Sequence, residues 1–175
     1  KAIICGIDYS DLCFSILDPN IEIDWSIKEG AEATPGEVIC HLKGKSQAII
    51  SAERTALNFL QTLSATATQT RRLVNMINHT NTRLLDTRKT LPNLRYAQKY
   101  AVKCGGGVNH RMGLYDCVML KENHILSIGS LEKSIEKALH EYPEKPVIVE
   151  VESLDQLQTA LSIKGITRIL CDNFF

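Results

Sequence analysis

Apolar and polar residues alternate in short runs over the first 50 positions of the chain. In Ile21-Glu22-Ile23-Asp24-Trp25 every second residue is apolar, which is typical of a half-buried strand. Turn-forming segments such as Asp18-Pro19-Asn20 and Pro35-Gly36 separate the runs. This pattern predicts a small β-rich layer for residues 1–50.

The apolar spacing becomes helical beyond this layer. Ser51 has the chemistry of a helix N-cap, and the apolar residues from Ala56 to Ile77 follow the helical period. The stretch from Ser64 to Thr70 is rich in Ser, Thr and Ala, so we expect it to break the segment into two helices. We place the domain boundary there and predict two domains, residues 1–68 and 69–175.

The second half of the chain alternates between strand and helix patterns. The predicted strands are 82–87, 115–120, 146–151 and 167–171, and the predicted helices begin at Pro92, Ser130 and Leu154. This alternation predicts an α/β fold with parallel strands. Glu150 and Glu152 share one face of their strand, which suits the mouth of an α/β barrel better than an open sheet buried on both faces.

Composition limits the classes of protein that remain possible. The chain has 175 residues, 44% of them hydrophobic and 23% charged, with no net charge, which is typical of a globular protein. No apolar run approaches the roughly 18 residues of a membrane span, and no secretory signal opens the chain. No two of the six cysteines are spaced as Cys-x-x-Cys, which argues against a zinc site or a redox pair. We therefore expect six reduced thiols in a cytoplasmic protein.

The charges are unevenly distributed although they cancel overall. Residues 83–124 hold eight Lys and Arg residues against three acids, an excess of five positive charges. Arg95, Lys99 and Lys103 recur at every fourth position, which predicts a solvated helix face, as does the pair Arg71-Arg72. A pI of about 7.1 and 6% aromatic residues argue against nucleic acid as the partner, so a pocket for a small polyanion is the better interpretation.

Ionisable residues gather in four segments where a predicted strand ends or a glycine loop precedes them. These are Thr87-Arg88-Lys89-Thr90, Asn109-His110-Arg111, Lys121-Glu122-Asn123-His124 and Cys171-Asp172-Asn173. Arginine offers a planar fork to carboxylates and lysine a point charge, so the segments together could bind an anion with several negative groups. Two alternatives remain open here. The run from Gly105 to Gly107 either only ends a helix or lets a substrate approach the backbone, and His124 is either a turn residue or part of the site.

Taken together, these motifs resemble the quinolinate phosphoribosyltransferase family. The matching segments, in chain order, are Glu53-Arg54-Thr55-Ala56-Leu57-Asn58, Thr87-Arg88-Lys89-Thr90-Leu91-Pro92, Lys99-Tyr100-Ala101-Val102, Gly105-Gly106-Gly107-Val108-Asn109-His110-Arg111-Met112-Gly113-Leu114-Tyr115-Asp116, Lys121-Glu122-Asn123-His124, Val149-Glu150-Val151-Glu152 and Leu170-Cys171-Asp172-Asn173. They span essentially the whole chain.

The resemblance implies a fold, a reaction and an assembly. The implied fold is an N-terminal open-faced α/β sandwich domain followed by an α/β barrel, incomplete in this chain, and the implied assembly is a homodimer. The implied reaction transfers the phosphoribosyl group of phosphoribosyl pyrophosphate to quinolinate with Mg²⁺. Its products are nicotinate mononucleotide, pyrophosphate and carbon dioxide, in NAD biosynthesis.

The resemblance also assigns roles to individual residues. The substrate-binding residues it implies are Arg54, Thr87, Arg88, Lys89, His110, Arg111, Lys121, Glu152 and Asp172. Lys89, Lys121, Glu152 and Asp172 are the implied catalytic residues, and Arg54 matches the arginine that reaches quinolinate from the partner subunit. Glu152 and Asp172 match the acids near the ribose and its metal ion, with Glu150 as a weaker candidate.

The chain also departs from the family pattern. Ser64-Ala65 stands where the family usually has Ser-Gly, and family chains extend further at both ends. We therefore expect this sequence to be part of a longer chain and not a competent catalyst as written. The alternatives are a related phosphoribosyltransferase acting on nicotinate, and a catalytically incomplete relative or fragment that only binds ligand or dimerises.

Overall fold

The computed structural model describes residues 1–174, which form two compact units; the first is Lys1–His110 and the second begins at Arg111. Helices and strands occur in both units, so the α/β prediction is confirmed. No helix within the described residues is both long enough and apolar enough to cross a lipid bilayer.

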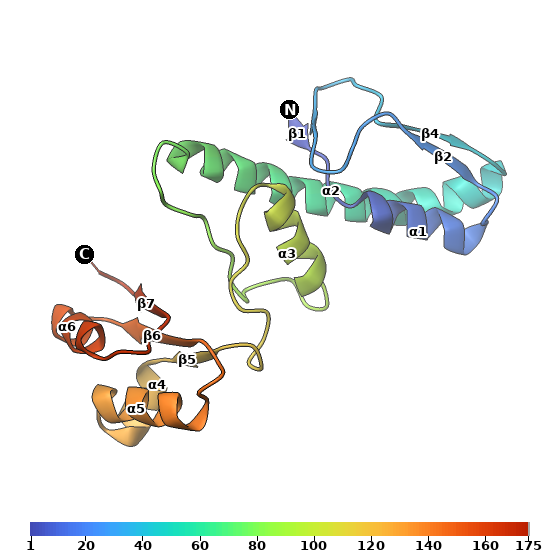
Figure 1. Ribbon diagram of the computed structural model, residues 1–175. Helices are drawn as coiled ribbons and strands as arrows, with labels where there is room; N and C mark the ends of the chain where they lie inside the picture. Colours follow the sequence, from blue (N-terminus) through green and yellow to red (C-terminus); the bar gives the residue numbers. More distant parts are fainter. Residues whose placement is uncertain (175) are drawn as a thin grey trace. The chain divides into compact units, whose positions relative to one another are not determined.

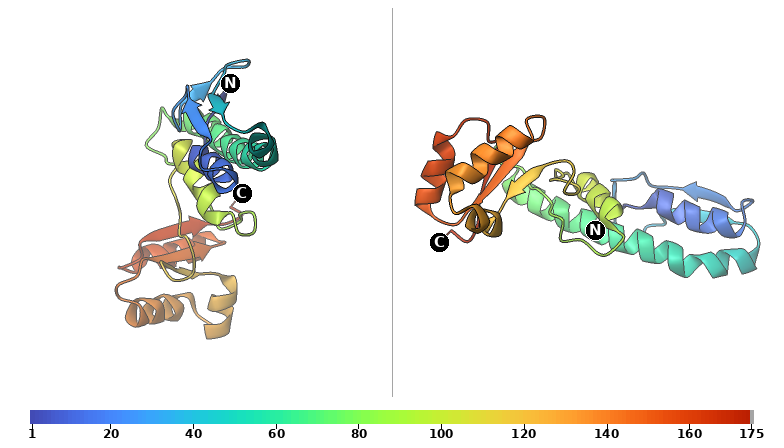
Figure 2. Two further views of the ribbon diagram at one scale, coloured as in Figure 1. Left: turned by 90° about the vertical axis from the view of Figure 1, so that its right-hand side faces the viewer. Right: turned by 90° about the horizontal axis from the view of Figure 1, so that it is seen from below.

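The first unit consists of short antiparallel strand pairs and three helices (Figure 1). Its elements are β1 (Ala2–Ile3), α1 (Ile7–Leu17), β2 (Glu22–Trp25), β3 (Glu32–Ala33), β4 (Cys40–Lys43), α2 (Ser46–Ile77) and α3 (Arg95–Cys104). Strand β1 pairs with β3, and β2 pairs with β4. Helix α1 runs beside the first half of α2, and α3 packs against α2 further along its length (Figures 1 and 2).

Helix α1 lies within the segment for which the sequence predicted only a β-rich layer. The carboxylate of Glu29 accepts hydrogen bonds from the N–H groups of Gly6 (2.8 Å) and Ile7 (3.1 Å), where α1 begins. Gly6 has a φ of 105°, and a Cβ there would lie 2.9 Å from Cδ1 of Leu63 on α2. The prediction missed this helix because the residue that caps it lies 22 positions away from Ile7.

Helix α2 is continuous, so the predicted break between Ser64 and Thr70 is wrong. The hydroxyl of Ser64 is buried and accepts a hydrogen bond from the N–H of Cys5 (2.9 Å). The hydroxyls of Thr66 and Thr70 donate to carbonyls one turn earlier in the helix, so they are satisfied without disrupting it. The predicted boundary after residue 68 lies within this helix and stays a prediction.

The segment after α2 contains less strand than the sequence predicted. Only an isolated bridge between Leu85 and Val108 forms in place of the strand 82–87, and α3 begins at Arg95 instead of Pro92. Arg71, predicted to be solvated, donates to the carbonyls of Gly105 (2.9 Å) and Cys104 (3.1 Å). It thereby satisfies carbonyls at the carboxyl end of α3, which a helix leaves without internal partners.

The second unit is a parallel three-stranded sheet with helical connections. Its elements are β5 (Val118–Leu120), α4 (Glu122–Ile128), α5 (Leu131–Glu141), β6 (Val147–Val151), α6 (Leu154–Ser162) and β7 (Arg168–Cys171). Strand β6 lies between β5 and β7 and is parallel to both. The parallel direction confirms the prediction from the alternating pattern. The side chains of Val147, Val149 and Val151 are fully buried in the core formed with α5 and α6.

Candidate functional site

Charged residues follow the carboxyl end of each strand in the second unit. Lys121 comes directly after β5, Glu152 directly after β6 and Asp172 directly after β7. In the register of the sheet, Leu120 lies opposite Val149 and Val151 lies opposite Cys171. Because the strands are parallel and adjacent, the three charged residues share one edge of the sheet, which is where α/β folds bind their ligands.

Lys121 is held at this edge by Glu150. Its Nζ donates to both carboxylate oxygens, Oε1 at 3.0 Å and Oε2 at 2.8 Å. The Glu150 side chain is 8% exposed, whereas that of Lys121 is 42% exposed. Lys121 therefore has a buried partner while its own side chain stays partly exposed, and the third N–H of its ammonium group could meet an anion. The sequence had ranked Glu150 as only a weaker candidate.

Glu152 and Asp172 are exposed next to one another along the same edge. The N–H of Asp172 donates to the carbonyl of Val151 (2.9 Å), and the N–H of Glu152 donates to Oε1 of Gln156 (2.8 Å). A hollow of about 130 Å³ lies here, lined by Glu122, Ile125, Leu126, Glu150, Glu152 and Gln156. Its acidic and apolar lining would favour a cation or the apolar part of a polar ligand.

Arg111 begins the second unit in a loop that Asp116 organises. One Asp116 oxygen accepts from the N–H of Met112 (2.6 Å) and the other from the N–H of Gly113 (3.1 Å). Burial works against ionisation of this carboxyl, but these hydrogen bonds and the Arg111 charge outweigh it and lower its pKa. The guanidinium of Arg111 lies 3.2 Å from Sδ of Met119 on β5. The sequence analysis had named Asp116 only within a segment that matches the family and had given it no role of its own.

In the first unit, a buried ion pair holds the main chain of His110. Lys99 donates to Asp86 and to the carbonyl of His110 (2.9 Å), while the N–H of His110 donates to Asp86 (2.7 Å). Lys99 is 1% exposed, so its assignment to a solvated helix face is wrong. Asn109 adds a hydrogen bond from Nδ2 to the carbonyl of Lys99 (3.1 Å). The network fixes the backbone from which the His110 side chain projects.

The loop with Thr87, Arg88 and Lys89 is ordered by short-range hydrogen bonds. The hydroxyl of Thr87 accepts from the N–H of Lys89 (3.0 Å), as expected of a turn. Arg95 donates to the hydroxyl of Thr90 (3.3 Å) and to the carbonyl of Arg88 (3.5 Å). Arg95 is therefore half-buried against the loop and not part of a solvated face, whereas Lys103 is exposed as predicted.

Two further residues have clear positions. Arg54 lies on α2 with its side chain exposed, and it forms no ion pair within residues 1–174.

Nδ1 of His124 accepts from the N–H of Lys121 (3.1 Å) at the start of α4, so the ring caps this short helix. The turn role of His124 is thus the one observed, with the ring accepting a hydrogen bond.

The predicted site residues are divided between the two units. Arg54, Thr87, Arg88, Lys89 and His110 belong to the first unit, and Arg111, Lys121, Glu152 and Asp172 belong to the second. The structure brings together the last three of these at one sheet edge. That the cationic residues of both units line one pocket stays a prediction.

Comparison with known proteins places the chain in one family along its whole length. Residues 1–64 match the model for the quinolinate phosphoribosyl transferase N-terminal domain, and residues 66–175 match the model for its C-terminal domain. The probable nicotinate-nucleotide pyrophosphorylase [carboxylating] of Bacillus subtilis is 43% identical over 91% of this chain. The corresponding protein of Mycobacterium leprae is 38% identical over 98% of the chain.

Solved structures support the same assignment. The nicotinate-nucleotide pyrophosphorylase of Francisella tularensis superposes with a TM-score of 0.96 at 46% identity, covering 99% of this chain and 62% of that one. NadC from Streptococcus pyogenes superposes with a TM-score of 0.94 at 38% identity, covering 100% and 62%. The likeness confirms the fold expected of an N-terminal sandwich followed by an incomplete barrel. This chain spans 55% and 61% of the Bacillus and Mycobacterium relatives. It belongs to the quinolinate phosphoribosyl transferase family.

Proposed function

We propose that the protein containing this chain transfers the phosphoribosyl group of phosphoribosyl pyrophosphate to quinolinate, with loss of carbon dioxide, to give nicotinate mononucleotide and pyrophosphate. The observation that carries the proposal is the row of Lys121, Glu152 and Asp172 after three adjacent parallel strands. A cation and two carboxylates at one sheet edge suit a reaction between an anionic ring and a sugar that develops positive charge. The names of the matched relatives describe the same chemistry.

The cationic residues of the proposed site suit quinolinate. Quinolinate carries two carboxylates on adjacent ring carbons, and arginine and lysine are the side chains that bind carboxylates most strongly. The proposed binding residues are Thr87, Arg88, Lys89, His110, Arg111 and Lys121. The side chain of Lys121 is partly exposed beside its buried partner Glu150, which supports its role. The buried network of Asp86 and Lys99 supports that of His110, because it fixes the main chain at that position.

Glu152 and Asp172 are proposed to act at the ribose. The ring nitrogen of quinolinate forms a bond to C1 of the ribose while the bond from C1 to pyrophosphate breaks, so positive charge develops on the sugar. Carboxylates placed nearby stabilise such charge. Mg²⁺ prefers oxygen ligands and is usually held by one or two carboxylates together with substrate phosphates. Glu152 and Asp172 offer two exposed carboxylates on neighbouring strand ends and would hold it; Mg²⁺ would neutralise the departing pyrophosphate.

We further propose a homodimer in which Arg54 reaches the site of the neighbouring subunit. Its exposed position on α2 and its lack of an ion partner within residues 1–174 support this role. A mixing experiment tests it. At a quinolinate concentration near the KM of the protein without substitutions, the full-length Arg54→Ala and Arg111→Ala variants are each expected to lose most of their activity. Their mixture is expected to regain activity through heterodimers with one intact site. Failure to regain activity in an exchanging mixture would contradict the shared site.

The six cysteines are all free. Reduced thiols are typical of proteins in reducing compartments, and this supports the proposal that the protein acts in the cytoplasm.

The reaction itself is tested by supplying the two substrates and Mg²⁺ to the full-length protein. Nicotinate mononucleotide and carbon dioxide are expected in equal amounts. Nicotinate offered in place of quinolinate is expected to react poorly, because it lacks one of the two carboxylates. No product from quinolinate would overturn the proposal, and binding without turnover would favour the alternative of a catalytically incomplete relative. The 175-residue chain alone, assayed in parallel, shows how much of the activity resides in it.

A further inference from the structure

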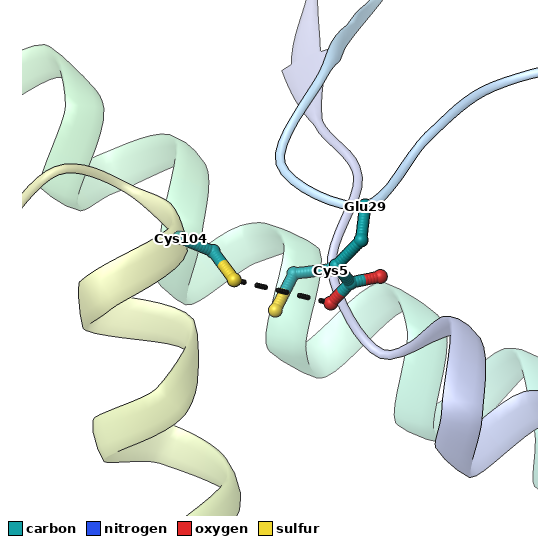
Figure 3. A group of neighbouring side chains, drawn as sticks. All are labelled: Cys5, Glu29 and Cys104. Carbon is teal, nitrogen blue, oxygen red and sulfur yellow. Dashed lines mark hydrogen bonds between the residues drawn. The ribbon is translucent and has the colours of Figure 1, made fainter.

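Two cysteines and a glutamate from distant parts of the sequence meet within the first unit. Cys5 lies between β1 and α1, Glu29 lies between β2 and β3, and Cys104 is the last residue of α3. Figure 3 shows the two sulfur atoms and the carboxylate turned toward one another. One ligand atom of each residue lies within 4.8 Å of the other two. The mechanism proposed above uses none of these side chains.

The spacing of the three ligand atoms is close to that required by a tetrahedral metal ion. Sγ of Cys104 lies 3.9 Å from Oε1 of Glu29. With a Zn–S bond of about 2.3 Å and a Zn–O bond of about 2.0 Å, the edge joining S and O in a tetrahedral site is about 3.5 Å long. A shift of a few tenths of an ångström would therefore bring these two ligands into coordination. In the absence of a metal, the thiol proton of Cys104 bridges the two atoms.

The carboxylate of Glu29 is already oriented for this role. Its two oxygens accept hydrogen bonds from the N–H groups of Gly6 and Ile7. Each carboxylate oxygen can accept more than one bond, so Oε1 keeps an electron pair for a cation. Backbone donors that fix a metal-binding carboxylate are a regular feature of metal sites.

The charge of the cluster suits a divalent metal ion. With both thiols deprotonated, the two sulfur atoms and the Glu29 carboxylate would carry three negative charges, with one ligand atom of each within 4.8 Å of the other two. A divalent cation that binds all three side chains neutralises two of these charges and takes up the thiols as thiolates, the form in which cysteine binds metals.

We propose that Cys5, Glu29 and Cys104 form a binding site for one thiophilic divalent cation of the Zn²⁺ type. Binding displaces one proton from each thiol, and the complex of two thiolates, one carboxylate and the cation carries a single negative charge. A water molecule takes the fourth position. Two sulfur ligands select against Mg²⁺, so this site is chemically distinct from the one proposed at Glu152 and Asp172. The ion would join the end of β1, the loop before β3 and the end of α3.

Cobalt absorption tests the proposal directly on the reduced, metal-free full-length protein. Co²⁺ bound to thiolates gives an intense charge-transfer band, and a tetrahedral site gives strong visible bands. We expect one Co²⁺ per chain, displaced by one equivalent of Zn²⁺ and not by excess Mg²⁺. Cys5→Ser and Cys104→Ser should each weaken binding by at least about 100-fold, because even groups that only orient a ligand contribute about 10- to 100-fold. Cys13→Ser, outside the cluster, should bind as the unchanged protein does.

Two results would overturn the proposal. One is the absence of a thiolate–cobalt band in the unchanged protein, including the case in which mild oxidation joins Cys5 to Cys104 instead. The other is a band that survives in both Cys5→Ser and Cys104→Ser. Circular dichroism spectra of the variants show whether they are folded. Should either serine variant fail to fold, the unchanged protein still decides the matter. Zn²⁺ should protect Cys104, and not the equally half-buried Cys13, from alkylation mapped by mass spectrometry, and equal labelling of Cys104 with and without Zn²⁺ would contradict the site.

Discussion

Lys99 on α3 forms a buried ion pair with Asp86, and both groups also bind the main chain of His110. Lys99 and Asp86 have side-chain exposures of 1% and 7%. Neither charge could be placed there alone, because an isolated buried charge is far more costly than a paired one. The pair therefore connects the stability of the first unit to the position of a proposed substrate-binding residue.

Replacing Lys99 by Met is expected to destabilise the protein by about 3–5 kcal/mol, because Asp86 would keep a buried charge without its partner. Urea unfolding of the full-length protein measures the loss. Lys103→Met, on the exposed side of the same helix, serves as the control and should change stability by less than about 0.5 kcal/mol. A similar small effect of Lys99→Met would show that the pair is not buried in solution. Adding Asp86→Leu should recover part of the loss.

Arg111→Ala in the full-length protein is expected to weaken quinolinate binding by roughly 10- to 100-fold. A charged hydrogen-bonded pair with a carboxylate contributes about 1.5–3 kcal/mol, which corresponds to that range of affinity. Phosphoribosyl pyrophosphate binding should change much less. Separate calorimetric titrations of the two substrates measure both effects.

Glu152→Gln and Asp172→Asn are expected to show the opposite behaviour. Each removes a negative charge proposed to lie near the ribose and its metal ion, so quinolinate should still bind while kcat falls. Titrations and steady-state kinetics on both variants measure the two quantities. If Arg111→Ala, Glu152→Gln and Asp172→Asn all lost affinity equally for both substrates, these residues would maintain the fold, and the assigned roles would be wrong.

Asp116→Asn should destabilise the protein in a pH-dependent manner. The folded-state pKa of Asp116 is lowered, so its ionised form contributes stability above the unfolded-state pKa of about 3.9, and that contribution is lost as the pH falls through the lower folded-state value. At neutral pH the loss of charged hydrogen bonds to Met112 and Gly113 should cost about 1–3 kcal/mol.

The measurement for Asp116 is a series of unfolding curves between neutral and strongly acidic pH. The difference between the variant and the unchanged protein should shrink as the solution becomes more acidic. Asp155→Asn serves as the control, because it makes the same substitution at an exposed residue in the first turn of α6. A difference for Asp116→Asn that is the same at every pH would mean that its effect is steric.

Gly105→Ala is expected to destabilise the first unit by about 1–3 kcal/mol through overpacking. A Cβ at this position would lie 2.5 Å from the carbonyl oxygen of Ala67 and 2.5 Å from Cβ of Thr70, both on α2. Gly105 has a φ of −71°, which any residue adopts, so the cost is entirely one of space. Thermal unfolding measures it, with Lys103→Ala as the control. An unchanged melting temperature would show that α3 and α2 are less closely packed than in this structure.

Most of the second unit followed from the sequence because its elements are local, although the short helix α4 was not predicted. Strand patterns that alternate with helical ones, a serine cap at position 130 and short connections indicate a parallel sheet, and the strand ends then place Lys121, Glu152 and Asp172 together. The pairing of Lys121 with Glu150 was not predicted, because alternation along a strand gives the face of a residue but not its partner on the next strand.

The first unit was harder to predict because distant residues determine it. Glu29 caps α1 from another loop, and Ser64 binds the backbone of Cys5 from the middle of α2, where a Ser- and Thr-rich stretch reads locally as a break. The spacing of Lys99 to Arg95 and Lys103 predicted that all three lie on a solvated helix face. The spacing places them on one face of the helix but does not show whether that face is buried. The carboxylate that requires Lys99 lies 13 positions earlier, in a segment without regular structure.

Helix α2 has a consequence for how this protein evolved and how it can be recombined. The two family models meet between residues 64 and 66, inside one unbroken helix whose earlier part packs on α1 and whose later part packs on α3. The boundaries of the two family models therefore differ from those of the compact unit Lys1–His110. In a chimera of two family members joined at residue 65, the junction between the two parent sequences lies in the middle of helix α2. Such a chimera should fold only when the residues that the two parents place at positions 63 and 67 pack together, because Leu63 and Ala67 lie in one buried cluster.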